Sequence, residues 1–218
     1  MRTDYLEAYR GGEGELIEKK SRFIAQVRPI KSEEEAASFI EEVRKKYWDA
    51  RHHCSAFSVG LVNPTLRCSD DGEPGGTAGR PMLDVITGAQ IHNICVVVTR
   101  YFGGTLLGTG GLVRAYSGAV KEGLKHSVIL HKKPGQELFI TCDYNGLGKL
   151  QYLAAQNGVQ ILDTEYTESV TARVMAPEEI CDGFIKKITE ATGGKAVIKK
   201  GEAPYYAEHD GEILLFSE

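Results

Sequence analysis

Apolar side chains change their spacing along the chain, from every second residue to every third or fourth residue and back. Alternation at every second position predicts a β-strand, whereas the wider spacing predicts a helix with one buried face. Ser32 and Glu35 have the spacing of a capping box, which marks the start of the first helix. The first 130 residues are therefore expected to hold strands over 15–29, 52–62, 66–69 and 93–101, and helices over 32–47, 80–86 and 112–126. The strand over 93–101 is β-branched and has the composition of a central, buried strand.

The pattern changes at a Pro- and Gly-containing break over residues 131–136. Beyond it, the spacing predicts the order βαββαβ, which is that of a ferredoxin-like unit. Its elements are a strand over 137–144, a helix over 146–158, two strands within 159–177, a helix over 178–194 and a strand over 195–201. We therefore predict an α+β protein with two domains, residues 1–133 and residues 134–218.

Composition excludes several classes of protein. No window approaches eighteen consecutive apolar residues, and the first twenty residues lack an apolar signal core, so we expect neither a transmembrane helix nor a secretory signal. Five cysteines without a CxxC pair are typical of reduced thiols, which indicates a cytoplasmic protein. Cys68 and Cys95 fall in strands and are expected to be core thiols.

The charges are unevenly distributed, although the net charge of the whole chain is only −4. Residues 1–133 hold 19 Lys and Arg against 16 Asp and Glu, whereas residues 134–218 hold 7 against 14. The first domain therefore permits an anionic partner, and the acidic second domain is a candidate surface for a protein partner.

Glycine is enriched and concentrated. The chain has 25 glycines in 218 residues, and ten of them lie between Gly72 and Gly111. They form two loops, each of which leads into the start of a predicted helix and has arginine beside it. Such loops leave backbone N–H groups free to bind phosphate, and neighbouring arginines strengthen this binding. Aromatic residues beside them are suited to stack on unpaired bases.

We predict that these residues form one anion- or RNA-binding surface, the alternative being that the loops are only tight turns. The surface comprises Gly76, Thr77, Gly79, Arg80, Arg100, Tyr101, Phe102, Gly103, Gly104, Gly108, Gly110, Gly111 and Arg114. A possible polar and acidic rim comprises His52, His53, Asp70, Asp71 and Glu73.

Known metal and nucleotide motifs do not fit. The chain has no GxxxxGK[ST] segment, and no GxGxxG segment follows the strand over 93–101. Adjacent histidines on a strand face opposite sides, which argues against zinc at His52 and His53. The acidic run from Asp70 to Glu73 is a candidate for a divalent cation, but solvated turn carboxylates are a more common use of such residues. We predict no metal, no cofactor and no catalytic residue.

The segment VVVTRYFGGTLLGTGGLVRAYS, preceded by DDGEPGGTAGRP, resembles the signature of the IMPACT family. The resemblance covers residues 15–128, and residues 134–218 look like the small C-terminal domain of bacterial members, itself similar to a terminal domain of elongation factor G. It implies a ribosomal protein S-five domain-two-like α/β fold, shared with the GHMP kinases, followed by a ferredoxin-like domain. Eukaryotic relatives bind a ribosome-associated activator and restrain a translation-controlling kinase, but they carry a different N-terminal extension, so we do not expect that partnership here.

Three hypotheses follow. The first is a non-catalytic protein that binds RNA or the ribosome and is linked to the regulation of translation. The second is an enzyme or binding protein for a small phosphorylated or nucleotide ligand at the same loops, with Asp70, Asp71 and Glu73 as candidate magnesium ligands. The third is an adaptor that binds a protein through the acidic domain. We favour the first, acting in the cytoplasm.

Overall fold

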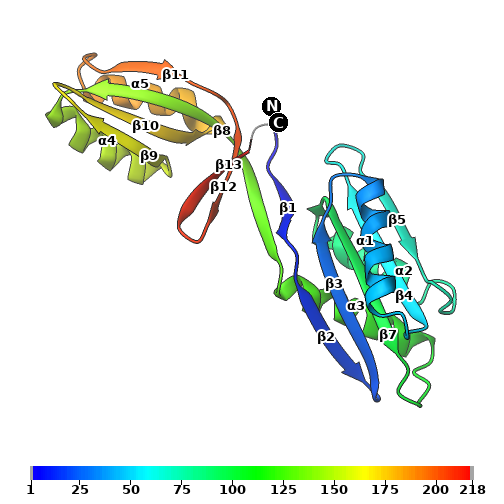
Figure 1. Ribbon diagram of the computed structural model, residues 1–218. Helices are drawn as coiled ribbons and strands as arrows, with labels where there is room; N and C mark the ends of the chain where they lie inside the picture. Colours follow the sequence, from blue (N-terminus) through cyan, green and yellow to red (C-terminus); the bar gives the residue numbers. More distant parts are fainter. Residues whose placement is uncertain (1, 217–218) are drawn as a thin grey trace. The chain divides into compact units, whose positions relative to one another are not determined.

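The computed structural model describes residues 2–216, and the chain divides into two compact units (Figure 1). One unit is Tyr5–Leu130, and the other is His131–Glu218 together with Met1–Asp4. The start of the chain thus belongs to the second unit, which no sequence pattern indicates. The domain ranges 1–133 and 134–218 stay a prediction.

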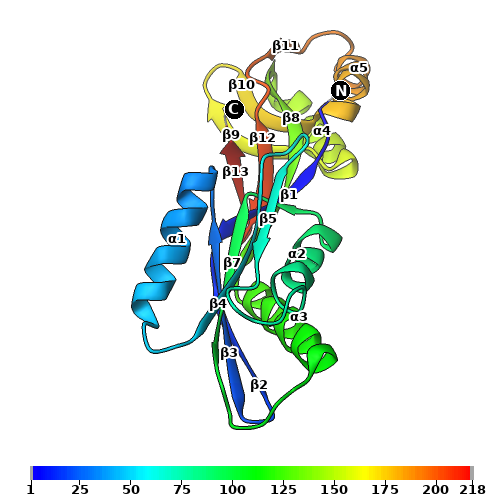
Figure 2. The same ribbon diagram turned by 90° about the vertical axis from the view of Figure 1, so that its right-hand side faces the viewer.

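The first unit is built on a five-stranded antiparallel sheet of the order β2-β3-β7-β4-β5. Its strands are β2 (Glu13–Glu18), β3 (Ser21–Pro29), β7 (Ile94–Tyr101), β4 (His52–Val59) and β5 (Thr65–Ser69). Helix α1 (Glu33–Lys46) covers one face, and α2 (Gly79–Gly88) and α3 (Thr109–Lys125) cover the other (Figure 2). A short parallel pair, β1 (Tyr5–Arg10) with β6 (Ile91–His92), completes the unit.

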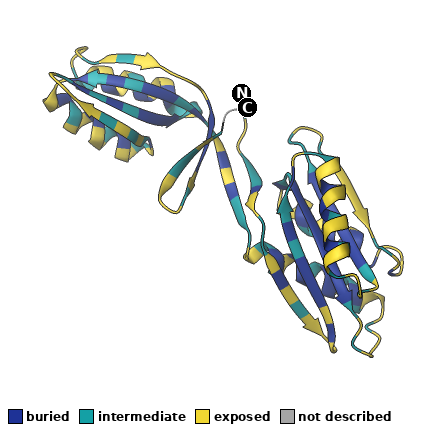
Figure 3. Cartoon of the chain, in the orientation of Figure 1, coloured by how far each residue is buried: buried dark blue, intermediate teal, exposed yellow. Residues whose placement is uncertain are grey.

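Both faces of this sheet are apolar, because each is covered by helices. On the face of α2 and α3, Phe23 packs edge-on against Tyr116 with their ring centroids 5.1 Å apart. On the face of α1, Phe39 and Val43 pack against Phe57. Strand β7 lies between the two layers and is buried from Ile94 to Arg100, as predicted for the central strand (Figure 3). Full burial of each large side chain contributes about 1.5–3 kcal/mol.

The predicted start of the first helix is confirmed by its cap. The Ser32 hydroxyl accepts the Glu35 N–H at 3.2 Å, and the Glu35 carboxylate accepts the Lys31 N–H at 2.7 Å. These bonds satisfy backbone donors that the helix itself leaves open.

The second unit has the predicted βαββαβ order, with a sheet in which β10 pairs with β8 and β9, and β11 pairs with β8. Its elements are β8 (Val128–Cys142), α4 (Tyr144–Asn157), β9 (Gln160–Tyr166), β10 (Val170–Pro177), a 3₁₀ turn η1 (Glu178–Ile180), α5 (Cys181–Ala191) and β11 (Val197–Lys200). Both helices pack on one face of the sheet, around Leu150, Phe184 and Ile188. The fold class is confirmed: an α+β chain with an S-five domain-two-like part and a ferredoxin-like part.

The structure corrects three expectations. The backbone has no break in secondary structure over 131–136, because β8 runs through it and pairs with β10 at Gly135 and with β12 at Pro134. The two units nevertheless divide between Leu130 and His131, at the start of this segment. The hairpin of β12 (Tyr205–His209) and β13 (Glu212–Phe216) was not predicted. Cys68 is exposed rather than in the core, since β5 is an edge strand of its sheet.

All five thiols are free. No helix among residues 2–216 is long and apolar enough to cross a membrane.

Candidate functional site

The first glycine-rich loop, residues 70–79, folds around the carboxylate of Asp70. One oxygen of Asp70 accepts the N–H groups of Ala78 at 3.0 Å and Gly79 at 2.8 Å, and the other accepts the N–H of Gly76 at 2.8 Å. The Thr77 N–H bonds to the Pro74 carbonyl instead. The backbone donors at the start of α2 are therefore occupied by a side chain of the same loop.

Asp70 is held in its charged form by these bonds. Burial opposes ionisation, but the N–H groups of Gly76, Gly79 and Ala78 outweigh it and lower the pKa of the carboxyl group. A carboxylate at a helix N-terminus is also favoured by the helix dipole. The loop thus carries its own anion.

The other two acidic residues of this loop also point inward. Asp71 accepts the backbone N–H of His53 at 2.6 Å and pairs with Arg44 at 2.8 Å. Glu73 is buried and accepts Nη1 of Arg100 at 2.6 Å and the hydroxyl of Tyr116 at 2.8 Å. Among residues 2–216, no group of three or more His, Cys, Asp or Glu side chains is placed to hold a metal ion.

The thiol beneath this network is protonated. Burial raises the pKa of Cys54 to about 12, and its S–H donates to the Asp70 carbonyl at 3.0 Å. Burial, followed by the neighbouring Cys54 and Glu73, raises the pKa of Tyr116 as well. Both groups are neutral at physiological pH and serve as donors that hold the loop against the sheet.

The second glycine-rich loop, residues 102–108, connects the end of β7 to the start of α3. It leads into α3, whose first turn has neither a side-chain cap nor an acidic residue. Gly104 and Gly108 have φ angles of 83° and 72°, which favour glycine. Gly103 approaches the backbone of Lys20 so closely that a Cβ atom there would collide with it. The loop is therefore fixed against the β2–β3 turn, while the start of α3 stays open.

A pocket of about 510 Å³ lies beside this loop, where β4 begins and β7 ends. It is lined by Asp49, Ala50, Arg51, His52, Arg100, Tyr101, Phe102 and Leu106. Phe102 and Leu106 are 56% and 82% exposed. The Tyr101 hydroxyl donates to Asp49 at 2.7 Å, and burial together with this bond raises the pKa of Tyr101 to about 12.

Cationic side chains lie at the same end of the unit as the pocket, and one of them, Arg51, is part of its lining. Lys19 and Lys20 form the β2–β3 turn, which Figure 1 shows at the same end of the unit as the loop after β7. With Arg51 they are exposed, and none of the three has an ion-pair partner within residues 2–216. Trp48, which precedes the pocket residue Asp49, is 81% exposed. We call Lys19, Lys20, Trp48, Arg51, Phe102 and Leu106 the strand-end surface.

The structure brings some of the predicted residues together and separates others. His52, Arg100, Tyr101 and Phe102 line one pocket. The amides of Gly76 and Gly79 are used by Asp70, and Arg80 pairs with Asp84 along α2 at 2.7 Å. His53 is buried.

Arg114 and Gly110 lie together on the first turns of α3, because Nη1 of Arg114 is 3.6 Å from the position of a Cβ on Gly110. Gly111 packs against Leu107. Five members of the strand-end surface were not predicted from the sequence. The Lys19-Lys20 pair between two strands, and the isolated Trp48 beside the polar turn that contains Arg51, are sequence signals for four of them. Leu106 has no such signal.

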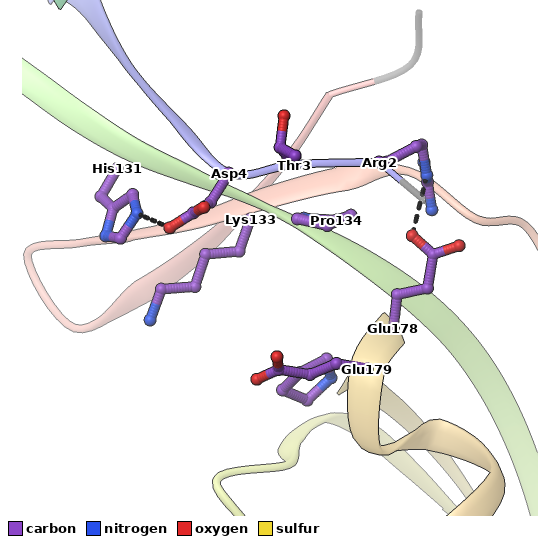
Figure 4. A pocket seen from close by; sticks show the side chains of 9 residues that line it. Arg2, Thr3, Asp4, His131, Lys133, Pro134, Glu178 and Glu179 are labelled. Atoms are coloured by element: carbon purple, nitrogen blue, oxygen red, sulfur yellow. Dashed lines mark hydrogen bonds and ion pairs between the residues drawn. The ribbon is translucent and has the colours of Figure 1, made fainter. Parts of the chain in front are cut away.

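The second unit has a pocket of about 400 Å³ around its N-terminal segment (Figure 4). Arg2 forms an ion pair with Glu178 at 3.1 Å, and Nε2 of His131 makes a hydrogen bond with Asp4 at 2.5 Å, so these two contacts tie residues 2–4 to η1 and β8. The lining also contains Lys133 and Glu179, so the walls are mixed in sign, and the two contacts anchor residues 2–4.

Comparison with known proteins decides the family. The Impact N-terminal domain matches residues 19–124, and a domain of unknown function, DUF1949, matches residues 140–195. The IMPACT family member YvyE of Bacillus subtilis is 38% identical over 205 residues, which cover 94% of each chain. This chain belongs to the IMPACT family.

Two further relatives agree with this assignment. The IMPACT family member YigZ of Escherichia coli is 40% identical over 178 residues, which cover 81% of this chain and 87% of YigZ. A crystal structure titled as that of a hypothetical protein is 36% identical, covers 93% of this chain and 99% of its own, and gives a TM-score of 0.58. The matched Impact N-terminal domain of this IMPACT protein contains both glycine-rich loops and the whole strand-end surface.

Proposed function

We propose that this protein is a non-catalytic nucleic-acid- or ribosome-binding protein that acts in the regulation of translation. The observation that carries the proposal is the strand-end surface, where unpaired cationic groups and exposed aromatic rings lie at one end of one sheet. Lysine and arginine bind phosphates, and exposed aromatic rings stack on unpaired bases. Single-stranded RNA offers both groups at once.

The open start of α3 supports the same proposal. The first turn of α3 contains Gly110 and Gly111, has no carboxylate, and carries Arg114 nearby. Its N–H groups add neutral donors for a phosphate, and the helix dipole favours the negative charge. The link to translation and the choice of RNA or ribosome as partner rest on the family resemblance, and the free thiols agree with a cytoplasmic site of action.

The experiment is the affinity for a fluorescently labelled single-stranded RNA, measured by anisotropy across a series of salt concentrations. Each phosphate contact in single-stranded RNA adds about 0.7 to the slope of log affinity against log salt. A Lys19→Ala, Lys20→Ala, Arg51→Ala variant should therefore bind more weakly and lose about two units of slope.

An Arg10→Ala, Lys31→Ala, Lys121→Ala variant is the matched control, because it removes three exposed cations that also lack an ion-pair partner within residues 2–216 and lie outside the strand-end surface. It should keep the wild-type slope. Affinity that does not change with salt in the wild type would exclude phosphate contacts, and equal losses in both variants would exclude this surface.

A second candidate is a binding site for a small phosphorylated or nucleotide ligand, favoured by the pocket of about 510 Å³ with Arg100 in its wall. Magnesium-dependent phosphoryl transfer has no support here, because Asp70, Asp71 and Glu73 are each engaged with protein donors. A thermal-shift series with nucleotides, with and without magnesium, tests it: ligand binding raises the melting temperature.

For the acidic second unit, we propose a protein partner. Capture of partners by the full chain, compared with a variant in which Asp163, Glu165 and Glu168 are replaced by Asn or Gln, tests this role. A partner held by charge is lost from the variant.

A further inference from the structure

One edge of the Arg100 guanidinium carries hydrogen-bond donors that have no partner within residues 2–216. Arg100 is buried, and its guanidinium lies between the rings of Phe23 and Phe102, at 5.4 Å and 5.7 Å from their centroids. Among residues 2–216, only Nη1 is bonded, and it donates to Glu73. Nε is buried without a hydrogen-bond partner, and Nη2 has no partner within residues 2–216 and is not fully buried. The edge formed by Nε and Nη2 is the one that binds two oxygens of a phosphate, so a ligand there would satisfy an otherwise orphaned donor.

His52 contributes a hydrogen-bond acceptor to the same pocket. Its Nδ1 lies 2.9 Å from the carbonyl oxygen of Asp71. A carbonyl can only accept, so Nδ1 carries the proton in the neutral ring and Nε2 keeps a lone pair. Nε2 forms no bond within residues 2–216 and is not fully buried. The pocket therefore contains an acceptor whose tautomer is set by the backbone of the first glycine-rich loop.

These two groups and an aromatic face lie on the same side of the sheet. His52 and Arg100 are directly opposite each other on β4 and β7, where Cβ atoms are about 4.5–5.5 Å apart. Phe102 is two residues beyond Arg100 and 56% exposed. Asp49, the acidic residue of the lining, is bonded to Tyr101, and Arg51 adds a second positive charge.

We infer that this pocket binds one nucleotide, with its phosphate on the Nε–Nη2 edge of Arg100, its base against Phe102 and a base N–H donating to Nε2 of His52. A simple anion would use only the arginine. A phosphate joined to a planar base with an N–H group uses all three features, and both an RNA chain and a free nucleotide supply that chemistry. For RNA, the inference rests on the proposed function and assigns to His52 the selection of the base.

The test compares oligouridine with oligo(N3-methyluridine), because this methyl group removes the single N–H of the uracil ring. The wild-type full chain should bind oligouridine about five- to tenfold more tightly, the size of one hydrogen bond. In His52→Asn the side-chain amide keeps the bond to the Asp71 carbonyl but removes the Nε2 acceptor. The two oligomers should then bind equally, whereas the dependence on salt should be retained.

His92→Asn is the matched control, since Nδ1 of His92 bonds to the Gly60 carbonyl at 2.9 Å in the same manner, outside the pocket. It should keep the wild-type preference for oligouridine. Salt-dependent RNA binding with no preference in the wild type, or with an unchanged preference in His52→Asn, would overturn the inference and leave the proposed function standing.

A second arm uses uridine monophosphate and uridine, measured by calorimetry. The phosphate should increase affinity, and Arg100→Lys, which keeps the charge beside Glu73 but not the two-donor edge, should lose most of that increase. Arg80→Lys is the control. If the nucleotide binds with this dependence and RNA does not bind, the pocket inference holds and the proposed function fails. If neither ligand binds, both fail.

Discussion

The two glycine-rich loops of this IMPACT protein look alike in sequence, but they differ in whether a carboxylate of the chain binds their backbone N–H groups. Each leads into a helix on the same face of the sheet. In the first, Asp70 accepts three backbone N–H groups and so takes the place of an external anion. In the second, the first turn of α3 has no side-chain cap and no acidic residue. A glycine-rich helix start is thus a potential anion site, and a nearby carboxylate decides whether it is open.

The largest expected effect concerns the network that anchors the first loop. Glu73→Gln leaves the charge of Arg100 buried without its counter-ion, which should lower the free energy of unfolding by about 3–5 kcal/mol in urea denaturation. Glu122→Gln, in an exposed pair with Lys125, should change it by less than about 1 kcal/mol. A loss below 1 kcal/mol for Glu73→Gln would show that this loop is not held by the buried pair.

The next largest effect is expected when the Asp70 carboxylate, which caps the start of α2, is removed. Asp70→Ala should lower the free energy of unfolding by about 2 kcal/mol, because three backbone donors lose their acceptor. Asp84→Ala, on the exposed face of α2, is the control.

The cap also predicts a dependence on pH. The folded-state pKa of Asp70 lies below its usual value of 3.8, so its contribution is present above that value and is lost as pH falls through the folded-state pKa. The free energies of unfolding of the wild type and Asp70→Asn should differ by their full amount at about pH 5 and above, and should converge as the pH falls below 3.8 through the folded-state pKa. A constant difference over this range would mean that the charge of Asp70 contributes nothing.

A smaller effect tests whether the second loop can be made like the first. Thr109→Asp places a carboxylate in the first turn of α3 and should stabilise the fold by about 0.5 kcal/mol through the helix dipole. The same change should weaken RNA binding severalfold, because the site then holds its own anion. Thr109→Asn is the neutral control. Unchanged affinity in Thr109→Asp would remove the start of α3 from the binding surface.

The smallest effect is expected at Arg80. Its exposed pair with Asp84 contributes about 0.5 kcal/mol or less, so Arg80→Ala should leave stability nearly unchanged. The salt slope of RNA binding should also be unchanged. A reduced slope would return Arg80 to the binding surface predicted from the sequence.

Local patterns predicted most of the fold and only part of the site. Ser32, the Gly158 cap of α4 and the alternating strands each act within a few residues, which is why periodicity finds them. The hairpin of β12 and β13 has a local signal of its own, Asp210-Gly211, and both residues have positive φ. The sequence order could not show that Asp70 reaches six to nine residues ahead to Gly76 and Gly79, or that Glu73 meets Arg100. These contacts depend on how the sheet folds back on itself.

The most direct measurement is an NMR titration of the ¹⁵N-labelled full chain with single-stranded RNA at low and at physiological salt. Backbone amides of residues 109–111 and of Arg51, His52 and Phe102 should shift, and the shifts should shrink at the higher salt. Amides of Gly76, Ala78 and Gly79 should stay in place, because Asp70 already holds them. Shifts confined to the first loop, or none at either loop, would contradict the account.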